Sequence, residues 1–390
     1  MNTNRIAIVV VAYNRVDSFT RLLESLQKVD FEGQQVPLII SIDHSGENKV
    51  FEAADQFAWN FGEKRIIRHE TNLGLKKHIL SCGDLLEDYD AIIVLEDDLM
   101  VSPAMYSYAW RAVERYQNDD RIAAISLYAK QWSEPAGMPF TPAHSNSDVY
   151  FIQTAESWGQ IWMRNQWNDF KEWYATNNEP FCKDDRIPVE ICRWDEKSWK
   201  KYHIKYCVEK NKYTVYPYEG LTTCMGAMGE HTKRNTFIAQ VPILERKRNS
   251  YTFSDFNDEA AVKYDAFLER IPEGENDVCM DLYGKKRNYD GFRYVISSKI
   301  LDYCVVDSFD LALRPHEENI LHAIKGSFFY KYDLQSPEKN RRRRDGEKVF
   351  EYYHYSTFSA ATDQMLLKTL LKAIFRRLKK KIKKLFRRKE

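Results

Sequence analysis

The sequence predicts an α/β protein with a mostly parallel central sheet flanked by helices, a small C-terminal α/β appendage and a basic amphipathic helix. Two observations favour this fold class. Up to residue 127, short apolar runs alternate with segments whose apolar residues recur at helical spacing. The run at residues 91–95 also leads directly into three acids, Glu96, Asp97 and Asp98. Such alternation is typical of parallel sheets, whose ligands bind at the carboxyl ends of the strands.

Apolar runs mark the strands expected in this sheet. They lie at residues 6–12, 36–42, 65–68, 91–95 and 122–127. Between these runs, apolar residues recur every three or four positions, as in Leu22 and Leu26, which predicts helices packed on the sheet. After the three acids, Ser102 and Pro103 supply an N-cap and a first-turn proline for a helix over residues 104–116.

The second half of the chain is less regular and richer in aromatic residues. Residues 130–149 are expected to form a long functional loop. Residues 150–174 contain four tryptophans, which form either a packed aromatic seam or a platform for a sugar ring. Trp158 and Trp162 are four residues apart, so on a helix they would share a face. A further helix is expected over residues 193–206.

The pattern predicts four parts along the chain. Residues 1–245 are expected to form the main α/β domain, and residues 246–340 a smaller appendage. Residues 341–361 begin with an arginine run and are expected to form an exposed linker. Residues 362–390 are expected to form the basic amphipathic helix.

Composition indicates an ordinary globular protein of a reducing compartment. The 390 residues are 44% hydrophobic and 29% charged. The seven cysteines are odd in number and include no Cys-x-x-Cys, which argues against a zinc site or a disulfide framework. The apolar run at residues 6–12 is too short for a signal peptide or a membrane span, so the cytoplasm is the expected compartment.

The C-terminal segment differs in charge from the rest of the chain. Residues 366–390 hold twelve of the 58 Lys and Arg residues and one of the 57 acids, so this segment carries +11 and the remainder −10. Its apolar residues form one stripe at steps of three or four, namely Leu367, Leu371, Ile374, Leu378, Ile382 and Leu385. A basic helix of this kind is expected to lie on the anionic inner face of the cell membrane. The alternatives are docking on the acidic body or, less favourably, nucleic-acid binding, which would leave the apolar stripe unused.

Polar side chains follow four of the expected strands. Arg15 follows the first, Asp43 the second, Asn72 the third and the three acids the fourth. Parallel strands would bring this cation, the lone acid, the polar loop and the three acids to one edge of the sheet. This combination favours a site for a nucleoside diphosphate and a metal, because hard cations prefer oxygen ligands. A solvated acidic loop is the alternative. Near the first strand there is no Gly-x-Gly-x-x-Gly or P-loop pattern, which argues against dinucleotide oxidoreductases and nucleoside-triphosphate hydrolases.

Several segments of the sequence together resemble a known family. Residues 5–235 are similar to inverting glycosyltransferases of the GT-A fold, such as N-acetylglucosaminyltransferase I and bacterial enzymes that build surface polysaccharides. The acids and Leu99 resemble the family's Glu-Asp-Asp-Leu version of the Asp-x-Asp motif. The other matching segments are residues 9–15, 39–43, 156–167 and 193–199.

The resemblance implies roles for individual residues. A divalent metal, manganese or magnesium, would bind Asp98, with His231 as a candidate second ligand. The nucleotide and donor sugar would contact Ala12, Arg15, Asp43, Asn72, Glu96 and Asp97. The acceptor sugar would lie near Glu156 and Trp158. The catalytic base would be Asp195, with Glu196 as the first alternative and Glu156 as the second.

The implied reaction is the inverting transfer of a hexosyl or N-acetylhexosaminyl group from a nucleotide sugar, most simply a UDP-sugar. The acceptor is a glycan hydroxyl, expected to be lipid-linked and to belong to a bacterial surface polysaccharide; nucleic acid is not an expected partner. The leaving diphosphate explains the need for a cation. Three alternatives remain open: a metal-dependent nuclease or phosphatase, a nucleotidyltransferase, and a non-catalytic carbohydrate-binding protein.

Overall fold

The computed structural model describes residues 5–226 and 239–340, together with six positions of the C-terminal segment, residues 367, 370, 371, 374, 375 and 378. The helices are α1 (Val16–Leu26), α2 (Lys49–Gln56), α3 (Leu75–Cys82), α4 (Met105–Tyr116), α5 (Arg164–Thr176), α6 (Val189–Cys192), α7 (Trp199–Glu209) and α8 (Glu318–Leu321), with a 3-10 turn η1 (Gly83–Glu87). The strands are β1 (Ile6–Ala12), β2 (Leu38–Ile42), β3 (Lys64–Arg68), β4 (Ala91–Glu96), β5 (Leu99–Val101), β6 (Ile122–Ser126), β7 (Trp132–Ser133), β8 (Met138–Pro139), β9 (Val149–Ile152), β10 (Gln160–Met163), β11 (Tyr213–Pro217), β12 (Thr222–Cys224), β13 (Lys263–Tyr264), β14 (Val278–Asp281), β15 (Tyr294–Ser297), β16 (Cys304–Phe309) and β17 (Phe329–Asp333).

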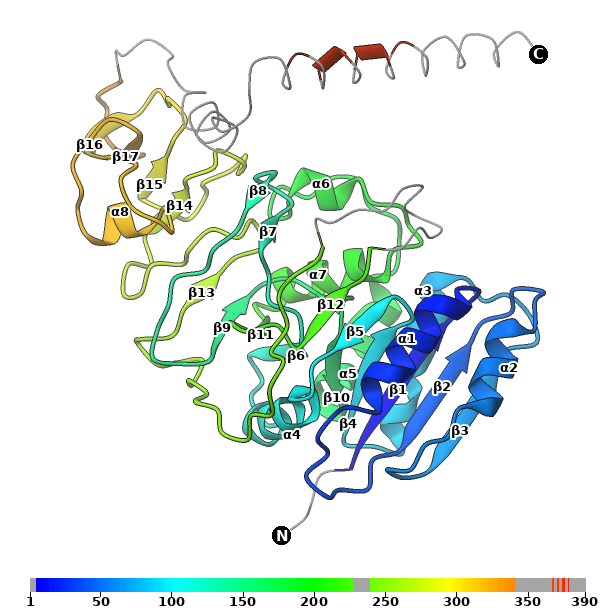
Figure 1. The fold of residues 1–390 in the computed structure, drawn as a ribbon. Coiled ribbons are helices and arrows are strands. Elements are labelled where there is room, and N and C mark those ends of the chain that lie inside the picture. Colours follow the sequence, from blue (N-terminus) through cyan, green and yellow to red (C-terminus); the bar gives the residue numbers. More distant parts are fainter. Residues whose placement is uncertain are drawn as a thin grey trace, which may run out of the picture.

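A nine-stranded sheet forms the centre of the molecule, in the order β13-β9-β11-β6-β10-β4-β1-β2-β3 (Figure 1). Strands β4, β1, β2 and β3 are parallel to one another. Strand β10 inserts antiparallel between β4 and β6, and β9 pairs antiparallel with β11. The prediction of a mostly parallel sheet flanked by helices is confirmed, and the parallel strands bring their carboxyl ends to one edge.

Two hydrophobic cores lie on opposite faces of this sheet because successive strand residues point to opposite sides. Ile8 and Val10 of β1 face a core that includes helices α1, α2 and α4. Ala7 and Val9 face a second core built with α3, η1, α5 and α7. Every residue of β1 is buried, which explains its uninterrupted apolar sequence.

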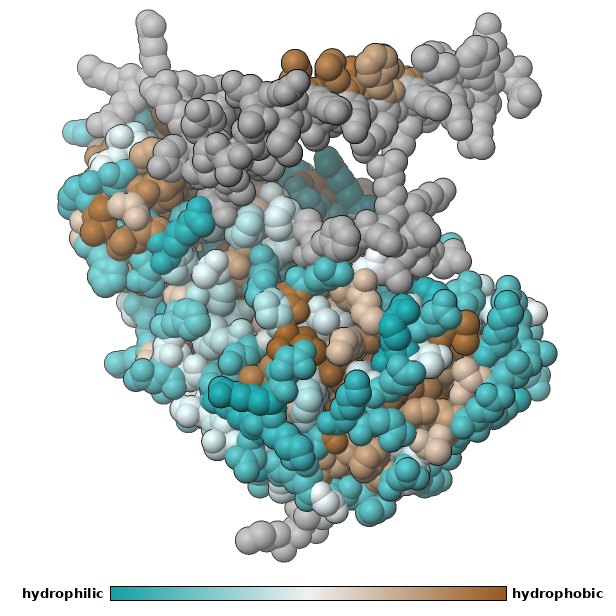
Figure 2. Space-filling model, in the orientation of Figure 1, coloured by the Kyte–Doolittle hydropathy of each residue, from teal (hydrophilic) through white to brown (hydrophobic). Residues whose placement is uncertain are grey.

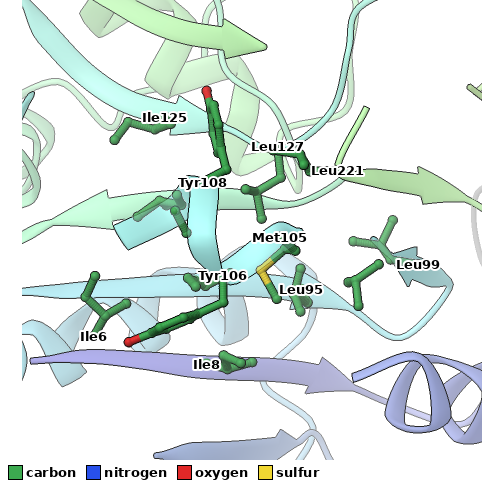
Figure 3. Close-up of a cluster of buried hydrophobic side chains, with 14 of the residues drawn as sticks. Ile6, Ile8, Leu95, Leu99, Met105, Tyr106, Tyr108, Ile125, Leu127 and Leu221 are labelled. Atoms are coloured by element: carbon green, nitrogen blue, oxygen red, sulfur yellow. The ribbon is translucent and has the colours of Figure 1, made fainter. Parts of the chain in front are cut away.

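Helix α4 fixes the end of β4 from one face of the sheet. Met105 and Tyr106 of this helix lie against Ile8 and Leu95 in the first core (Figure 3). Ser102, predicted as an N-cap, accepts a hydrogen bond from the Ala104 N–H at 3.0 Å. The helix begins at Met105, one residue after its predicted start, and β5 (Leu99–Val101) lies just before it and pairs with β12.

All five strands expected up to residue 127 are present within one or two residues of their predicted ends. Two expectations farther along are wrong. Trp158 and Trp162 do not share a helix face, since Gln160–Met163 forms β10. The helix expected from residue 193 begins only at Trp199, because the Asp195 carboxylate accepts the Lys197 N–H at 2.8 Å and holds a turn there.

The appendage contains a separate four-stranded sheet in the order β14-β15-β17-β16, with α8 in the connection before β17. It appears in yellow and orange in Figure 1. Strand β13, from Lys263 to Tyr264, instead pairs with β9 of the central sheet. The main sheet thus includes residues beyond 245, and the exact division at residue 245 stays a prediction.

The six described positions of the C-terminal segment are helical and carry exposed apolar side chains. Their exposed fractions lie between 44% and 69% for Leu367, Leu370, Leu371, Ile374, Phe375 and Leu378. They are the brown residues along the top of Figure 2. The predicted linker over residues 341–361, and Ile382 and Leu385 of the stripe, lie outside the described residues. In the part of the chain that is described, no helix is both long and apolar enough to cross a lipid bilayer.

Candidate nucleotide-sugar site

The carboxyl ends of β1, β2 and β4 bring the predicted donor residues to one sheet edge. Val11 of β1 lies in register with Glu96 of β4, and Ala12 with Ile42 of β2. The Ala12 carbonyl accepts the Asp43 N–H at 3.0 Å, which joins the first two of these strand ends. The parallel register therefore determines the position of the site.

Arg15 lies between two of the three acids that follow β4. Its Nη1 donates to Asp98 Oδ2 at 2.8 Å, and its Nη2 forms a shorter ion pair with Asp97 Oδ1. The second oxygen of Asp97 accepts the Tyr13 N–H at 3.4 Å. The remaining oxygen of Asp98, Oδ1, is buried and has no hydrogen-bond partner among residues 5–226 and 239–340. An unpartnered buried carboxylate oxygen is costly, and a cation would satisfy it.

Burial and repulsion between neighbouring carboxylates raise the pKa values of Glu96 and Asp97. Burial, followed by the charges of Asp98 and Asp97, raises the pKa of Glu96 to about 8. Burial also raises the pKa of Asp97 to about 6, although Arg15 opposes the rise. The two carboxylates raise the pKa of Arg15 despite the opposing effect of its burial. Excess negative charge in an enclosed site suits the binding of a cation.

Asp43 organises the loop that follows β3. Its Oδ1 accepts the N–H groups of His44 at 2.9 Å and Leu73 at 2.8 Å, and its Oδ2 accepts that of Gly74 at 3.0 Å. Gly74 has a φ of +74° and immediately precedes α3. Asn72, on the same loop, donates to the His44 carbonyl at 3.0 Å. Asp43 and Asn72 are thus brought together as predicted, but the Asp43 carboxylate is engaged by backbone groups.

Glu156 is a fully buried carboxylate with several partners. Its Oε1 accepts the Ser157 N–H at 2.9 Å and the Lys200 ammonium at 3.4 Å, and its Oε2 lies 3.8 Å from the Lys130 ammonium. Burial alone would raise its pKa, but Lys200, Lys130 and two backbone N–H groups hold the pKa below its usual value. Glu156 therefore serves as the counter-ion of two lysines in this structure.

Replacing Glu156 by glutamine should destabilise the fold by about 3 kcal/mol, because it leaves the buried Lys130 with one counter-ion fewer. The pKa of Glu156 is lowered in the folded state, so its contribution is present above the unfolded pKa of about 4.3 and is lost as pH falls through the folded value. Chemical denaturation of the wild type and the variant at pH 7 and pH 3.5 measures the difference in the free energy of unfolding. The matched control, Glu134→Gln, removes the more exposed partner of Lys130 and should cost about 1 kcal/mol or less. Equal losses in the two variants would contradict the assignment.

Lys200, at the start of α7, is a site residue that the sequence did not predict. Its ammonium lies 5.4 Å from the centre of the Trp158 ring and 5.6 Å from that of Trp194. It pairs with Glu156, and its charge also favours ionisation of Glu96. It thus links the segment of Trp158 and the turn before α7 to the acidic end of β4. In the sequence, the one hint of this role is that Lys200 follows the candidate base Asp195 by five residues.

The two candidate bases differ in their surroundings. Glu196 pairs with the buried Lys201 ammonium and accepts the Tyr202 hydroxyl, and these partners lower its pKa although burial opposes the shift. Asp195 is exposed, and one of its oxygens accepts the Lys197 N–H at 2.8 Å. The Glu196 carboxylate is therefore committed to structural partners, whereas Asp195 presents its carboxylate to solvent.

The donor set for a metal consists of the acids after β4. Asp98 fits a divalent cation because one of its oxygens has no partner among the described residues. Asp97 forms an ion pair with the same Arg15 guanidinium as Asp98. His231, the second predicted ligand, lies outside the described residues. Within residues 5–226 and 239–340, no group of three His, Cys, Asp or Glu side chains could hold a metal ion.

Comparison with known families bears on this site directly. Residues 7–166 match Glycosyl transferase family 2. The matched segment extends from β1 into the start of α5, and so includes Arg15, Asp43 and all three acids. The match and the helix-flanked sheet confirm the predicted GT-A fold class. No curated protein sequence shows significant similarity to the chain.

Among solved structures, the chain is similar to TarS 1–349 of S. aureus, with 13% identity, a TM-score of 0.35, and coverage of 56% of this chain and 59% of that one. It is also similar to the mannosyltransferase PcManGT of Pyrobaculum calidifontis, with 11% identity, a TM-score of 0.34 and coverage of 56% and 58%. For GalNAc-T7 the identity is 14%, the TM-score 0.39 and the coverage 56% and 43%. Each match spans less than two thirds of the related chain.

Proposed function

We propose that the protein transfers a hexosyl or N-acetylhexosaminyl group from a nucleotide sugar, with UDP as the nucleotide, to a glycan hydroxyl with inversion. The observation that carries this proposal is the cluster of Arg15, Asp97 and Asp98 at the carboxyl ends of β1 and β4, inside the glycosyltransferase domain. Both the phosphate-binding cation and the metal-binding oxygens that a nucleoside-diphosphate leaving group needs are present there. We also propose that the chain resembles N-acetylglucosaminyltransferase I in particular.

The residues of the cluster have separate tasks in the proposed reaction. Asp98, with His231 as the proposed second ligand, would hold manganese or magnesium, which stabilises charge on the departing diphosphate. Ala12, Asp43 and Asn72 form the strand ends and loop beside which the nucleoside would lie. Glu96 and Asp97 would orient the donor, and Arg15 would neutralise a phosphate.

On the acceptor side, the proposed base is Asp195. A carboxylate that removes a proton from the attacking hydroxyl must reach that hydroxyl, and Asp195 is exposed. The nearby Glu196 is occupied by Lys201. Trp158 is half-buried, and its ring lies next to the Lys200 ammonium. We propose this ring as the apolar surface for the acceptor sugar. Glu156 would act there by holding Lys200 in place.

A thermal-shift panel tests the donor proposal. Manganese combined with UDP- and GDP-sugars is added to the protein, and a bound donor is expected to raise the melting temperature by mass action. Donors that stabilise the protein are then assayed for transfer and for slow hydrolysis. Stabilisation by simple sugars alone, without any effect of nucleotides, would favour the carbohydrate-binding alternative and contradict the proposal.

We further propose that the acceptor is lipid-linked, as in bacterial surface polysaccharide synthesis, and that the C-terminal helix holds the enzyme on the cytoplasmic face of the membrane. Exposed apolar side chains at Leu367, Leu371, Ile374 and Leu378 lie in a segment with a charge of +11. Apolar burial in the interface and attraction to anionic lipids would act together, with about 1 kcal/mol from each basic residue near the surface.

The full chain is expected to co-sediment with vesicles of phosphatidylcholine and phosphatidylserine, and less so at 0.5 M salt, because salt screens the attraction. A chain ending at Asp363 should remain in the supernatant and still use a short soluble acceptor. In the full chain, replacing both Leu371 and Ile374 by serine keeps the charge and should weaken sedimentation. Equal sedimentation of the full and shortened chains would refute membrane binding, and unfolding of the shortened chain would favour docking on the body.

A further inference from the structure

The Arg15 guanidinium is engaged by the acids that the proposed function assigns to the metal and donor. It bridges Asp97 and Asp98, whose side chains are 4% and 15% exposed. The same guanidinium is the proposed partner of the donor phosphate. One N–H of Nη1 and one N–H of Nη2 donate to carboxylates here, so a phosphate bound by these two N–H groups would have to take the place of the carboxylates.

Arg15 already occupies one of the two oxygens of Asp98. The Oδ2 atom is 2.8 Å from Arg15 Nη1, whereas Oδ1 is buried and has no hydrogen-bond partner among the described residues. A divalent ion binds a carboxylate oxygen at about 2.1 Å, so an ion on Oδ2 would lie close to the guanidinium and be repelled by its positive charge. Arg15 therefore competes with an added cation for these acids.

We infer that Arg15 is an exchangeable internal cation: it neutralises Asp97 and Asp98 in the free protein and moves to the diphosphate when a divalent metal and the nucleotide bind together. This inference rests on the proposed function. In the exchange, the carboxylates lose one cation and gain another, and the guanidinium exchanges carboxylate for phosphate oxygens. Charged partners are present before and after binding, so neither group is left buried and unpaired.

The exchange predicts strong coupling between the two ligands. Manganese alone must displace Arg15 without providing it with a new anion, and nucleotide alone must leave two uncompensated carboxylates. Each ligand should therefore bind weakly alone and at least about tenfold more tightly in the presence of the other, by the same factor in both directions.

Calorimetric titration of the full chain with manganese, with UDP, and with each in the presence of the other measures this coupling. Arg15→Gln removes the competing charge at similar length, and should bind manganese alone about tenfold more tightly than the wild type while losing most of the coupling. Arg15→Lys keeps one charge but cannot bridge both acids, and should be intermediate. Arg68→Gln, which removes an exposed arginine of β3 that pairs with Asp55 of α2, is the matched control and should titrate like the wild type.

The outcomes separate the inference from the proposed function. Manganese affinity that is unchanged or weaker in folded Arg15→Gln and Arg15→Lys would overturn the exchange, even if UDP binds. If neither UDP nor GDP binds any of the proteins while manganese binds Arg15→Gln more tightly, competition at the acids is supported and the proposed function is overturned. Thermal unfolding of each variant shows whether it is folded, and the lysine variant provides the comparison if the glutamine variant is not.

Discussion

Asp98→Asn is expected to abolish manganese-dependent donor binding and transfer while the protein remains folded. Asp98 supplies a buried carboxylate oxygen that has no partner in the described part of the chain, and an amide oxygen without charge is a poor substitute on a divalent ion. Loss of outer ligands alone weakens metal binding by about tenfold to a hundredfold, so loss of this ligand should exceed that range. Calorimetry with manganese and UDP-sugar measures the change.

The fold is expected to tolerate this substitution because its effects oppose one another. The ion pair with Arg15 Nη1 is lost, but the repulsion that Asp98 exerts on Glu96 is also removed. Asp90→Asn is a suitable control, since Asp90 immediately precedes the other end of β4 and pairs there with Arg164. The assignment of Asp98 is wrong if the variant keeps wild-type manganese and donor affinity.

Asp195→Asn is expected to lose transfer by about a hundredfold to ten-thousandfold and to keep its affinity for the donor. The base acts on the acceptor hydroxyl, so its contribution appears in the transition state and not in donor binding. The amide can still accept the Lys197 N–H, so the turn before α7 should persist. Initial rates at saturating donor, together with donor calorimetry, separate the two effects.

Glu196→Gln is the matched comparison for this experiment. Its carboxylate pairs with the buried Lys201 and accepts the Tyr202 hydroxyl, so the variant should lose thermal stability more than activity. Normal turnover by Asp195→Asn combined with inactivity of folded Glu196→Gln would assign the base to the neighbour. Loss of donor affinity in Asp195→Asn would instead indicate a role on the donor side.

Much of the parallel sheet could be predicted from sequence because its strands are buried on both faces. Such strands are continuous apolar runs, as residues 6–12 and 91–95 show, and the residues after each run must then share one edge. The sequence therefore predicts that Arg15, Asp43 and the acids lie together at that edge. Strand β10 is not predicted by the sequence, because Trp162 follows Trp158 by four residues and this spacing also suits a helix.

The partners of each side chain could not be predicted in the same way. Asp43 was expected to face the nucleoside, yet its oxygens accept three backbone N–H groups from loops that meet only in the folded chain. Nothing in the sequence distinguishes Lys200 from the lysines beside it, and only packing brings it to Glu156 and two tryptophan rings. These contacts depend on tertiary structure, which residue spacing does not encode.

The pairing of β13 with β9 bears on how the chain can be shortened. All four residues of β9 are buried, and on this side Phe151 and Gln153 donate their N–H groups to the Val262 and Tyr264 carbonyls at 2.9 and 3.0 Å. A fragment ending at residue 245 would leave these groups unpaired on a strand of Val, Tyr, Phe and Ile. Such a strand is a template for self-association, so this fragment would aggregate even with every donor contact intact.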